Sequence, residues 1–379
     1  MLFQCRGFAS AAAEPLRILF CGSQRFSIPS LEALYRERGR DPGLVRALEV
    51  LVTPPRRSGR GLKVVEESPC QRLAERLGLR IHQRETFTGW ELPQGTNLII
   101  VVSFRLFVPP RILRSAKYGG LNVHPSFLPD LRGPAPLHRA LLRGDDHIGM
   151  SLQTLDEDQI DHGTILAQTP KPGFPIPPGA GIEEVTQEAA TRGAQMLIEG
   201  LRGGLYLPPR RDVGWKAAEL EGQQLVRAPK VTRAESQIDW TGWTRADEFE
   251  RRIRACTKIW TQAVDRRGQQ KRVIFTEASR VAAEEVRGEE ASVVFVHEQA
   301  DGHGSAPERR RQERRVMVDR DRGSCAVLVG DATWVLMTTA QVEGKTRQDA
   351  ATALAPFLRT EGGAAQNKQR KTNKQEPTG

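Results

Sequence analysis

The sequence contains no long apolar run and no pair of neighbouring cysteines. No stretch approaches the roughly 18 apolar residues that a membrane-spanning helix requires, so we expect no membrane partner. The five cysteines, at positions 5, 21, 70, 256 and 325, lie far apart. This spacing matches neither the paired cysteines of a zinc site nor the dense cysteines of a secreted disulfide scaffold. The first apolar run ends at Gly22 without the GxGxxG pattern of a dinucleotide site.

Acidic residues are also missing from residues 1–13, which contain Arg6 and Ser10 among alanines and phenylalanines. Acid-free leaders with arginine and serine are typical of mitochondrial transit peptides. We therefore predict a transit peptide over residues 1–15 and a location in the mitochondrial matrix; a disordered cytosolic tail is the alternative. Residues 359–379 are polar and mostly basic, so we predict a second tail that is disordered because it cannot form a core.

Positive charge is abundant in this chain. Lys and Arg number 56 and Asp and Glu 46, which gives a formal net charge of +10 at pH 7. Such an excess favours polyanionic partners, with nucleic acid as the first candidate. Charge alone does not separate a nucleic-acid-binding protein from a merely basic soluble one. The length of 379 residues indicates two domains.

The first half of the chain alternates between apolar runs and helical patterns. The runs occupy residues 16–22, 47–53, 97–104, 121–124, 148–155 and 164–168, and the helical patterns occupy residues 29–38, 69–77, 136–143 and 182–201. This alternation predicts an α/β domain over residues 16–205, with a doubly wound, mostly parallel sheet. Ligands of such sheets bind at the carboxyl ends of the strands.

The second half has a different pattern. Residues 206–227 are rich in Pro, Gly, Arg and Gln and predict a linker. A helix is expected at residues 244–254, followed by short strands at residues 273–276, 291–296, 315–318, 326–329 and 333–338. Short strands in this number favour a small β-barrel, similar to oligonucleotide-binding folds, over residues 228–358. The Gly- and Arg-rich residues 299–314 are expected to form a loop between two of the strands.

Three polar residues stand out near the end of the first domain. Asn122 and His124 are two positions apart in a short strand, so their side chains point to the same face. An amide and an imidazole on one face suit a carbonyl oxygen that becomes an oxyanion. Asp161 follows the next strand and could reach His124 and hold it charged. With no reactive Ser or Cys beside them, they indicate direct acyl transfer rather than a covalent intermediate.

Two motifs support this chemistry. The segment NVHPSFLPDLRGPAP at residues 122–136 resembles the signature of the folate-dependent formyltransferases, and DHGTI at residues 161–165 resembles that family's D-x-G-x-I element. Residues 17–34, 52–79 and 228–240 resemble the branch of the family that acts on aminoacylated tRNA. The resemblance extends from about residue 16 to about residue 355, and it implies the formyltransferase fold followed by a tRNA-binding barrel.

The resemblance also implies a reaction, in which the formyl group of 10-formyltetrahydrofolate moves to the α-amino group of an initiator methionyl-tRNA for mitochondrial translation. Asn122 and protonated His124 would stabilise the oxyanion, and Asp161 would hold His124 and move protons through a water. No metal is implied, and the protein is expected to act as a monomer. The folate-binding residues implied are Phe104, Arg105, Leu106, Ser126, Leu128, Pro129, Gly133 and Asp156.

The tRNA contacts implied lie in both domains. A basic loop after the second apolar run would meet the acceptor arm, and further basic residues would continue the contact, because each lysine or arginine can pair with a phosphate. The loop residues are Arg56, Arg57, Arg60 and Lys63, and the others are Lys230, Arg251 and Arg254. A solvated surface loop is the alternative for the first group.

The chain departs from the family pattern at residues 156–163, which are one residue longer and lack the middle glycine. This departure means that the path of the catalytic loop is not predicted.

Two other functions remain as alternatives. One is a 10-formyltetrahydrofolate-dependent transferase or hydrolase acting on a small amine, and the other is a non-catalytic RNA-binding relative.

Overall fold

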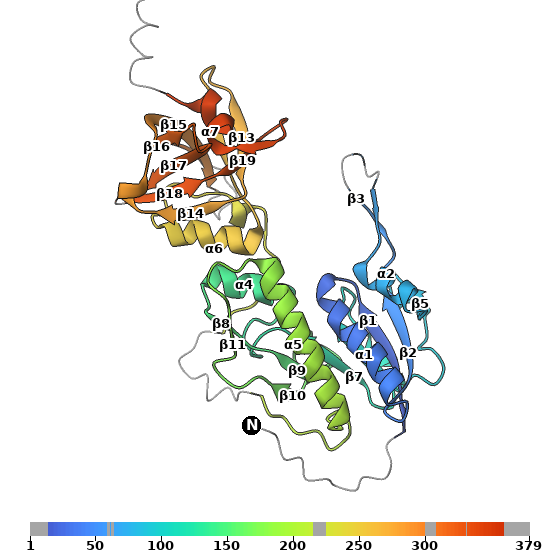
Figure 1. Cartoon of the computed structure of the whole chain (residues 1–379). Helices are drawn as coiled ribbons and strands as arrows, with labels where there is room; N and C mark the ends of the chain where they lie inside the picture. Colours follow the sequence, from blue (N-terminus) through green and yellow to red (C-terminus); the bar gives the residue numbers. More distant parts are fainter. Residues whose placement is uncertain are drawn as a thin grey trace, which may run out of the picture. The chain divides into compact units, whose positions relative to one another are not determined.

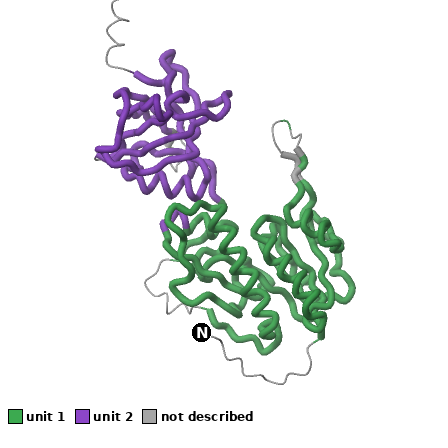
Figure 2. Tube along the Cα trace, in the orientation of Figure 1, with its two compact units in different colours: residues 1–140, 145–230 green, residues 141–144, 231–379 purple. Residues whose placement is uncertain are grey.

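The computed structural model describes residues 14–58, 61, 64–214, 225–299, 308–330 and 332–359. The chain divides into two compact units (Figure 2). The first unit comprises residues 1–140 and 145–230, and the second comprises residues 141–144 and 231–379. Most of the predicted transit peptide, nearly all of the predicted basic tail and residues 215–224 of the predicted linker lie outside the described residues. In the described part of the chain, no helix is both long and apolar enough to cross a membrane.

The first unit is built on a seven-stranded sheet with the order β10-β9-β7-β6-β1-β2-β5 (Figure 1). Its strands are β1 (Leu16–Gly22), β2 (Val45–Val52), β5 (Arg80–Gln83), β6 (Leu98–Val102), β7 (Gly120–His124), β9 (Ser151–Thr154) and β10 (Ile165–Gln168). The five strands from β7 to β5 are parallel, whereas β9 is antiparallel to both β7 and β10. The central strand β6 is almost wholly buried, as apolar strands in parallel sheets are. The predicted, mostly parallel α/β sheet is thus confirmed.

Helices cover both faces of this sheet. They are α1 (Ile28–Arg40), α2 (Pro69–Arg76), α3 (Pro110–Ser115), α4 (Pro136–Arg143) and α5 (Ile182–Arg202). At Gly193, α5 comes so close to Val123 of β7 that an added Cβ would lie 2.7 Å from that side chain, whereas Gly120 of β7 faces α3. Residues an odd number of positions apart on a strand face opposite ways. Asn122 and His124 therefore share the face of Gly120, away from α5.

Two small hairpins complete the first unit: β3 (Arg56–Ser58) with β4 (Val64–Glu66), and β8 (His147–Ile148) with β11 (Phe174–Pro175). The first hairpin corrects part of the predicted basic loop. Arg56 and Arg57 belong to a strand, in which they pair with Glu66 and Val65. Arg60 and Lys63 lie outside the described residues.

The second unit contains a nine-stranded sheet with the order β14-β18-β17-β16-β15-β12-β13-β19-β20. Its strands are β12 (Ile259–Val264), β13 (Gln270–Phe275), β14 (Ala278–Val281), β15 (Glu289–Gln299), β16 (Glu308–Asp319), β17 (Ser324–Val329), β18 (Thr333–Met337), β19 (Thr339–Val342) and β20 (Arg347–Asp349); its helices include α6 (Ala246–Cys256) and α7 (Ala350–Leu354). All neighbouring strands are antiparallel. The core includes Trp240 stacked on Phe295 at a ring distance of 4.2 Å. This antiparallel unit is consistent with the predicted barrel.

One prediction in the second unit was wrong. Residues 308–314, expected in a loop, form the first part of strand β16, in which Arg310 pairs with His297 and Arg311 with Val296 of β15. Charged side chains stand on both faces of this part of the strand, so the sequence lacks the apolar alternation that marks a half-buried strand. This part of β16 is held as a strand by its main-chain pairing with β15, which the side-chain pattern does not indicate.

Candidate active site

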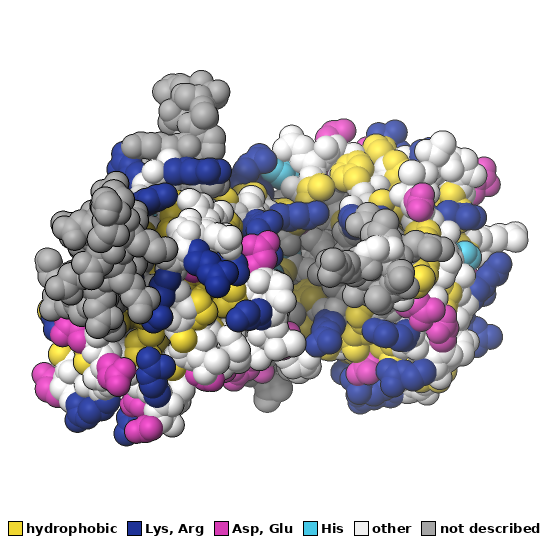
Figure 3. All heavy atoms as spheres, turned by 90° about the horizontal axis from the view of Figure 1, so that it is seen from above, with side chains coloured by type: hydrophobic (Ala, Val, Ile, Leu, Met, Phe, Trp, Pro, Cys, Tyr) yellow, Lys and Arg dark blue, Asp and Glu magenta, His cyan; other side chains and the backbone are white. Residues whose placement is uncertain are grey.

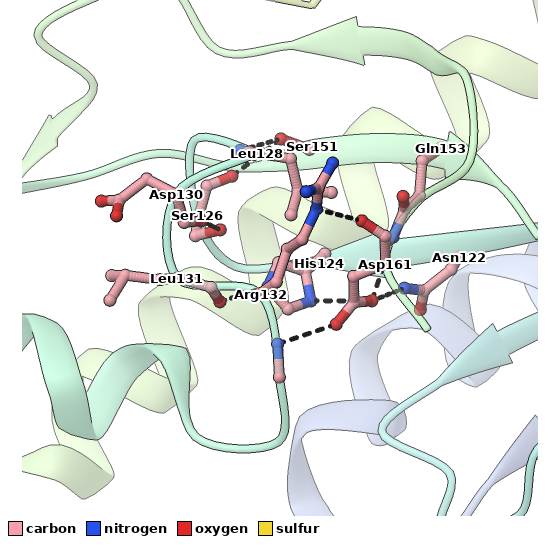
Figure 4. Close-up of polar contacts among 11 residues, drawn as sticks. Asn122, His124, Ser126, Leu128, Asp130, Leu131, Arg132, Ser151, Gln153 and Asp161 are labelled. Atoms are coloured by element: carbon pink, nitrogen blue, oxygen red, sulfur yellow. Dashed lines mark hydrogen bonds and ion pairs between the residues drawn. The ribbon is translucent and has the colours of Figure 1, made fainter. Parts of the chain in front are cut away.

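The three polar residues singled out by the sequence meet at the carboxyl end of β7 (Figure 4). Asn122 and His124 are on β7, and Asp161 is on the loop between β9 and β10. The side chains of His124 and Asp161 are 6% and 5% exposed, so both are nearly removed from water. The structure therefore brings the predicted catalytic residues together, at the strand ends where open α/β sheets bind ligands.

The Asp161 carboxylate is the centre of the group. Its Oδ1 atom accepts hydrogen bonds from Asn122 Nδ2 over 3.2 Å and from Gln153 Nε2 over 3.1 Å, and it lies 3.4 Å from His124 Nδ1. Its Oδ2 atom accepts a hydrogen bond of 2.9 Å from the main-chain nitrogen of Gly133. A buried carboxylate needs such partners, since burying a charge alone is costly.

The backbone at Asp161 is held in an unusual conformation. Its φ of +60° lies in the left-handed region, where a non-glycine residue is strained. Arg132 Nε donates a hydrogen bond of 2.8 Å to the Asp161 carbonyl oxygen. Burial lowers the pKa of Arg132, partly offset by the charge of Asp161. This contact and the Gly133 contact fix the loop on which the carboxylate lies.

His124 is held from both sides. Its Nε2 atom lies 3.0 Å from the carbonyl oxygen of Leu131, which can only accept, while Nδ1 faces Asp161. When the imidazole is protonated, each of its two N–H groups therefore has an acceptor: the Leu131 carbonyl oxygen for Nε2 and Asp161 Oδ1 for Nδ1. The Asn122 amide carries two hydrogens, and Asp161 takes one of them. In this arrangement the second Asn122 hydrogen is the one available to an incoming carbonyl oxygen.

The loop of residues 125–135 carries Leu131 and Gly133 and is itself tied down. Ser126 Oγ donates to the carbonyl oxygen of Asp130 over 2.7 Å, and the Leu128 main-chain nitrogen donates to Ser151 Oγ over 3.2 Å. Three residues of this loop that were predicted to bind folate are not among the described residues that line the cavity: Ser126 and Leu128, which are buried, and Pro129, which is half-buried.

The end of the predicted linker and the first residues of the predicted barrel domain lie along the same loop, so residues 228–230 belong to the first unit. The Leu131 nitrogen donates to the Val226 carbonyl over 2.8 Å, the Ala228 nitrogen donates to the Arg132 carbonyl over 2.7 Å, and the Ala135 nitrogen donates to the Ala228 carbonyl over 3.0 Å. We call residues 226–230 the strap. Ala228 is completely buried beneath the loop.

A cavity of about 440 Å³ opens in front of the three predicted catalytic residues. This volume is in the range of pockets that hold drug-sized ligands, roughly 300–1,000 Å³. Five residues that were predicted to bind folate line it: Phe104, Arg105, Leu106, Gly133 and Asp156. Apolar side chains form much of the remaining wall, among them Phe26, Val108 and Leu137. The cavity thus combines apolar walls with one polar corner.

The polar residues of this cavity that were not among the predicted site residues include Gln153 and His138. Gln153 pairs with Asn122 across β9 and β7, and it could not be predicted because a single sequence does not reveal which strands pair. His138 lies on α4, where burial and the neighbouring charge of Arg139 lower its pKa. The predicted tRNA residue Lys230, which ends the strap, also lines the cavity.

The remaining predicted tRNA residues are placed as follows. Arg251 and Arg254 lie on α6 of the second unit, where Arg251 pairs with Asp247 at 3.4 Å. In the face shown in Figure 3, Lys and Arg side chains are spread widely, with acidic side chains between them.

Within the ranges that the structure describes, no three His, Cys, Asp or Glu side chains gather in a way that could hold a metal ion. Chemistry without a metal stays a prediction.

Known proteins resemble this chain in sequence. Residues 16–201 match the family model described as formyl transferase. The methionyl-tRNA formyltransferase of Halorhodospira halophila is 34% identical over 251 residues, which cover 64% of this chain and 74% of that protein. The methionyl-tRNA formyltransferase of Bartonella quintana is 32% identical over 250 residues, which cover 63% of this chain and 74% of that protein.

Solved structures resemble it in fold. One is WlaRD, a sugar 3N-formyl transferase studied in the presence of dTDP and 5-N-formyl-THF; it has 13% identity and a TM-score of 0.50, with 88% of this chain and 100% of that chain covered. Another is the N-formyltransferase of Helicobacter canadensis with folinic acid and dTDP-3-aminofucose, at 14% identity and a TM-score of 0.50, with coverages of 85% and 98%. At such low identity the likeness concerns the fold alone.

Proposed function

Because the chain belongs to the methionyl-tRNA formyltransferases, within the formyl transferase family, we propose that it transfers the formyl group of 10-formyltetrahydrofolate to the α-amino group of methionyl-tRNA. One observation in the structure carries this proposal: Asn122 and His124 both contact the buried carboxylate of Asp161 in the wall of a cavity. An amide and an imidazolium suit a carbonyl oxygen that gains negative charge.

The cavity fits the proposed formyl donor. Its volume of about 440 Å³ suits a bicyclic ring with a substituent, and apolar side chains such as Phe104 and Leu106 offer surface for stacking and contact. Asp156 also lines the cavity, and its Oδ1 atom accepts the main-chain hydrogen bonds of the turn that forms this part of the wall. These features support the binding of a pteridine, and the donor then supplies an activated formyl group.

Three side chains act on the transfer itself. Asn122 donates its second amide hydrogen to the formyl oxygen, and this bond strengthens as negative charge develops there. His124, held between Asp161 and the Leu131 carbonyl, adds positive charge at the cavity wall when its imidazole is protonated. Asp161 keeps both in place and moves a proton through a water: the amine nitrogen loses it as the new C–N bond forms, and N10 receives it as the old bond breaks.

The test uses the purified full chain with 10-formyltetrahydrofolate and initiator-type tRNA, either charged with methionine or uncharged. We expect formyl-methionine to be recovered from the charged tRNA and no reaction with the uncharged tRNA. If the enzyme instead formylates a small amine and ignores charged tRNA, the proposed substrate is wrong. If it binds tRNA tightly but transfers nothing, the proposed activity is wrong.

We further propose that the reaction serves initiation of translation in the mitochondrial matrix. The acid-free composition of residues 1–13, with Arg6, supports this location. The test is to fuse residues 1–15 to a fluorescent protein and to express the full chain with a C-terminal fluorescent tag. We expect both to accumulate in mitochondria, and a diffuse cytosolic signal from the full chain would contradict the proposal.

A further inference from the structure

Gln153 lies directly opposite Asn122, because β9 and β7 pair these two residues in their antiparallel register. Directly opposed residues on neighbouring strands project from the same face and lie within contact distance. The Gln153 residue is 1% exposed and lines the cavity. Figure 4 shows its amide reaching Asp161 from the side of β9, while Asn122 reaches the same carboxylate from β7.

The hydrogen bond to Asp161 fixes the orientation of the Gln153 amide. Carboxylate oxygens only accept, so the NH2 end must point to Asp161 Oδ1, 3.1 Å away, and Oε1 must point away from it. Oε1 is buried and finds no hydrogen-bond donor among the described residues. A buried acceptor without a donor costs stability, and an apolar side chain of equal length would avoid that cost. The unpaired Oε1 offsets part of what the bond to Asp161 contributes, so folding stability alone does not explain a glutamine at this position.

We propose that Gln153 is a positioning residue for formyl transfer, which holds the Asp161 carboxylate in place for Asn122 and His124. The proposal rests on the function proposed above. Asp161 needs this support because its backbone is strained at φ +60° and lies on an exposed loop that includes Ile160, 66% exposed. Gly133 fixes Oδ2 and Gln153 fixes Oδ1, so the carboxylate cannot rotate. Without Gln153, Asp161 turns and the Asn122 amide loses its alignment.

The chain contains a matched control. Gln71 on α2 is also buried, its Nε2 atom also donates to a carboxylate oxygen (Glu75 Oε1, 2.9 Å), and its Oε1 also finds no donor among the described residues. Gln71 does not belong to the residues that line the cavity. The two glutamines therefore share their hydrogen-bond pattern and differ in their relation to the active site; the Glu75 partner is exposed, whereas the Asp161 carboxylate is buried.

The experiment compares the variants Gln153→Met and Gln71→Met in the full chain. For both we expect only a small change in melting temperature, because the lost bond to a carboxylate is offset by the removal of the unpaired Oε1. For Gln153→Met alone, kcat should fall about 10- to 100-fold, with KM for both substrates changed less than threefold, since misplaced catalytic groups slow the reaction without weakening binding. If the wild type is active and Gln153→Met keeps kcat within twofold, or loses activity only in proportion to folded protein, the positioning role is wrong.

A second measurement does not depend on activity. The variant Gln153→Glu sets a carboxylate against Asp161, and two adjacent carboxylates raise each other's pKa. A carboxyl group whose pKa is higher in the folded state loses its stabilising contribution as pH rises. The charged groups that face Asp161, namely His124 from β7 and Arg132 from the loop, are the same in wild type and variant. We expect the melting temperature of Gln153→Glu to fall relative to wild type between pH 5 and pH 8.

Parallel pH curves for wild type and Gln153→Glu would show that residue 153 does not contact Asp161 and would overturn the inference even if the enzyme is active. An inactive wild type together with diverging curves would leave the contact intact and reject only the proposed function. The two failures are thus distinguishable.

Discussion

The Asp161 carboxylate is contacted by side-chain nitrogens of three residues, Asn122 and His124 on β7 and Gln153 on β9. Substitutions of these residues should have different effects on catalysis. After its bond to Asp161, the Asn122 amide keeps one hydrogen for a ligand in the cavity. For Asn122→Ala we predict a 100- to 1,000-fold lower kcat, as is usual when a donor to an oxyanion is removed. KM for 10-formyltetrahydrofolate and the melting temperature should change little. Steady-state kinetics and thermal unfolding measure these quantities.

The control for this variant is Asn97→Ala. Asn97 is buried at the other end of the sheet, where it accepts from the Arg17 nitrogen over 2.8 Å and donates to the Pro15 carbonyl over 3.1 Å. It should lower the melting temperature and leave kcat per folded molecule unchanged. If Asn122→Ala shows the same pattern as Asn97→Ala, Asn122 has only a structural role.

The sequence predicts those site residues that are recognisable from their type and their spacing along the chain. Asn122 and His124 share a face because they are two positions apart, and Asp161 follows the next strand. Gln153 was not predicted, because its function depends on a strand pairing that only the folded chain reveals. The role of the Leu131 carbonyl as partner of His124 was equally hidden, since every residue has a carbonyl group.

The loop between β9 and β10 is closed at its start by Asp156. Its Oδ1 atom accepts main-chain hydrogen bonds from Asp158 and Gln159 over 2.9 and 2.8 Å, and these bonds hold the pKa of Asp156 below its ordinary value of 3.8. The turn is therefore stabilised above about pH 3.8, and this contribution is lost as pH falls through the lowered pKa.

For Asp156→Ala we predict a 3- to 10-fold higher KM for 10-formyltetrahydrofolate, roughly 1 kcal/mol of binding, because the turn at the cavity rim loses its acceptor. Asp156→Asn keeps a side-chain oxygen at the same position and should stay within twofold of wild type. Equal KM values for Asp156→Ala and wild type at pH 7 would mean that the turn does not shape the cavity.

The strap and the loop of residues 125–135 meet at Gly133, where φ is +125° and an added Cβ would lie 2.7 Å from the Ala228 carbonyl oxygen. Gly133→Ala should therefore destabilise the protein by more than about 2 kcal/mol and lower kcat, since the Gly133 nitrogen also binds Asp161. The control is Gly89→Ala, at φ +65° with nothing within 4 Å, which should cost about 1–2 kcal/mol and leave kcat unchanged. Urea unfolding and kinetics separate the two effects, and identical losses in both variants would exclude a role of the contact with Ala228.

Elements with a clear apolar pattern were predicted well. The run at residues 97–104 forms the buried strand β6, and the helix predicted at residues 136–143 has those bounds in the structure. β16 was missed in its first half, and α3, a helix of six residues, was missed because it is too short to show a period. In both cases tertiary contacts determine a conformation that local sequence does not specify.

The charge of the whole molecule, +10, should make tRNA binding depend on salt. With about four phosphate contacts, Kd should rise on the order of 100-fold between 50 and 200 mM salt. The double variant Arg251→Glu, Arg254→Glu should weaken binding at 50 mM salt and flatten this dependence, whereas Arg46→Glu, at an exposed position of β2, is the control. Filter binding measures Kd. An unchanged salt dependence in the double variant would mean that these residues of α6 do not contact tRNA.

The strap has a consequence for how natural variants of this enzyme are interpreted. Residues 226–230 are about 65 positions after Asp161 in the chain, yet their main chain is hydrogen-bonded to the loop that binds both Asp161 and His124. We therefore expect a bulkier residue at Ala228 to slow turnover while RNA affinity stays normal, although the sequence alone assigns position 228 to the second domain.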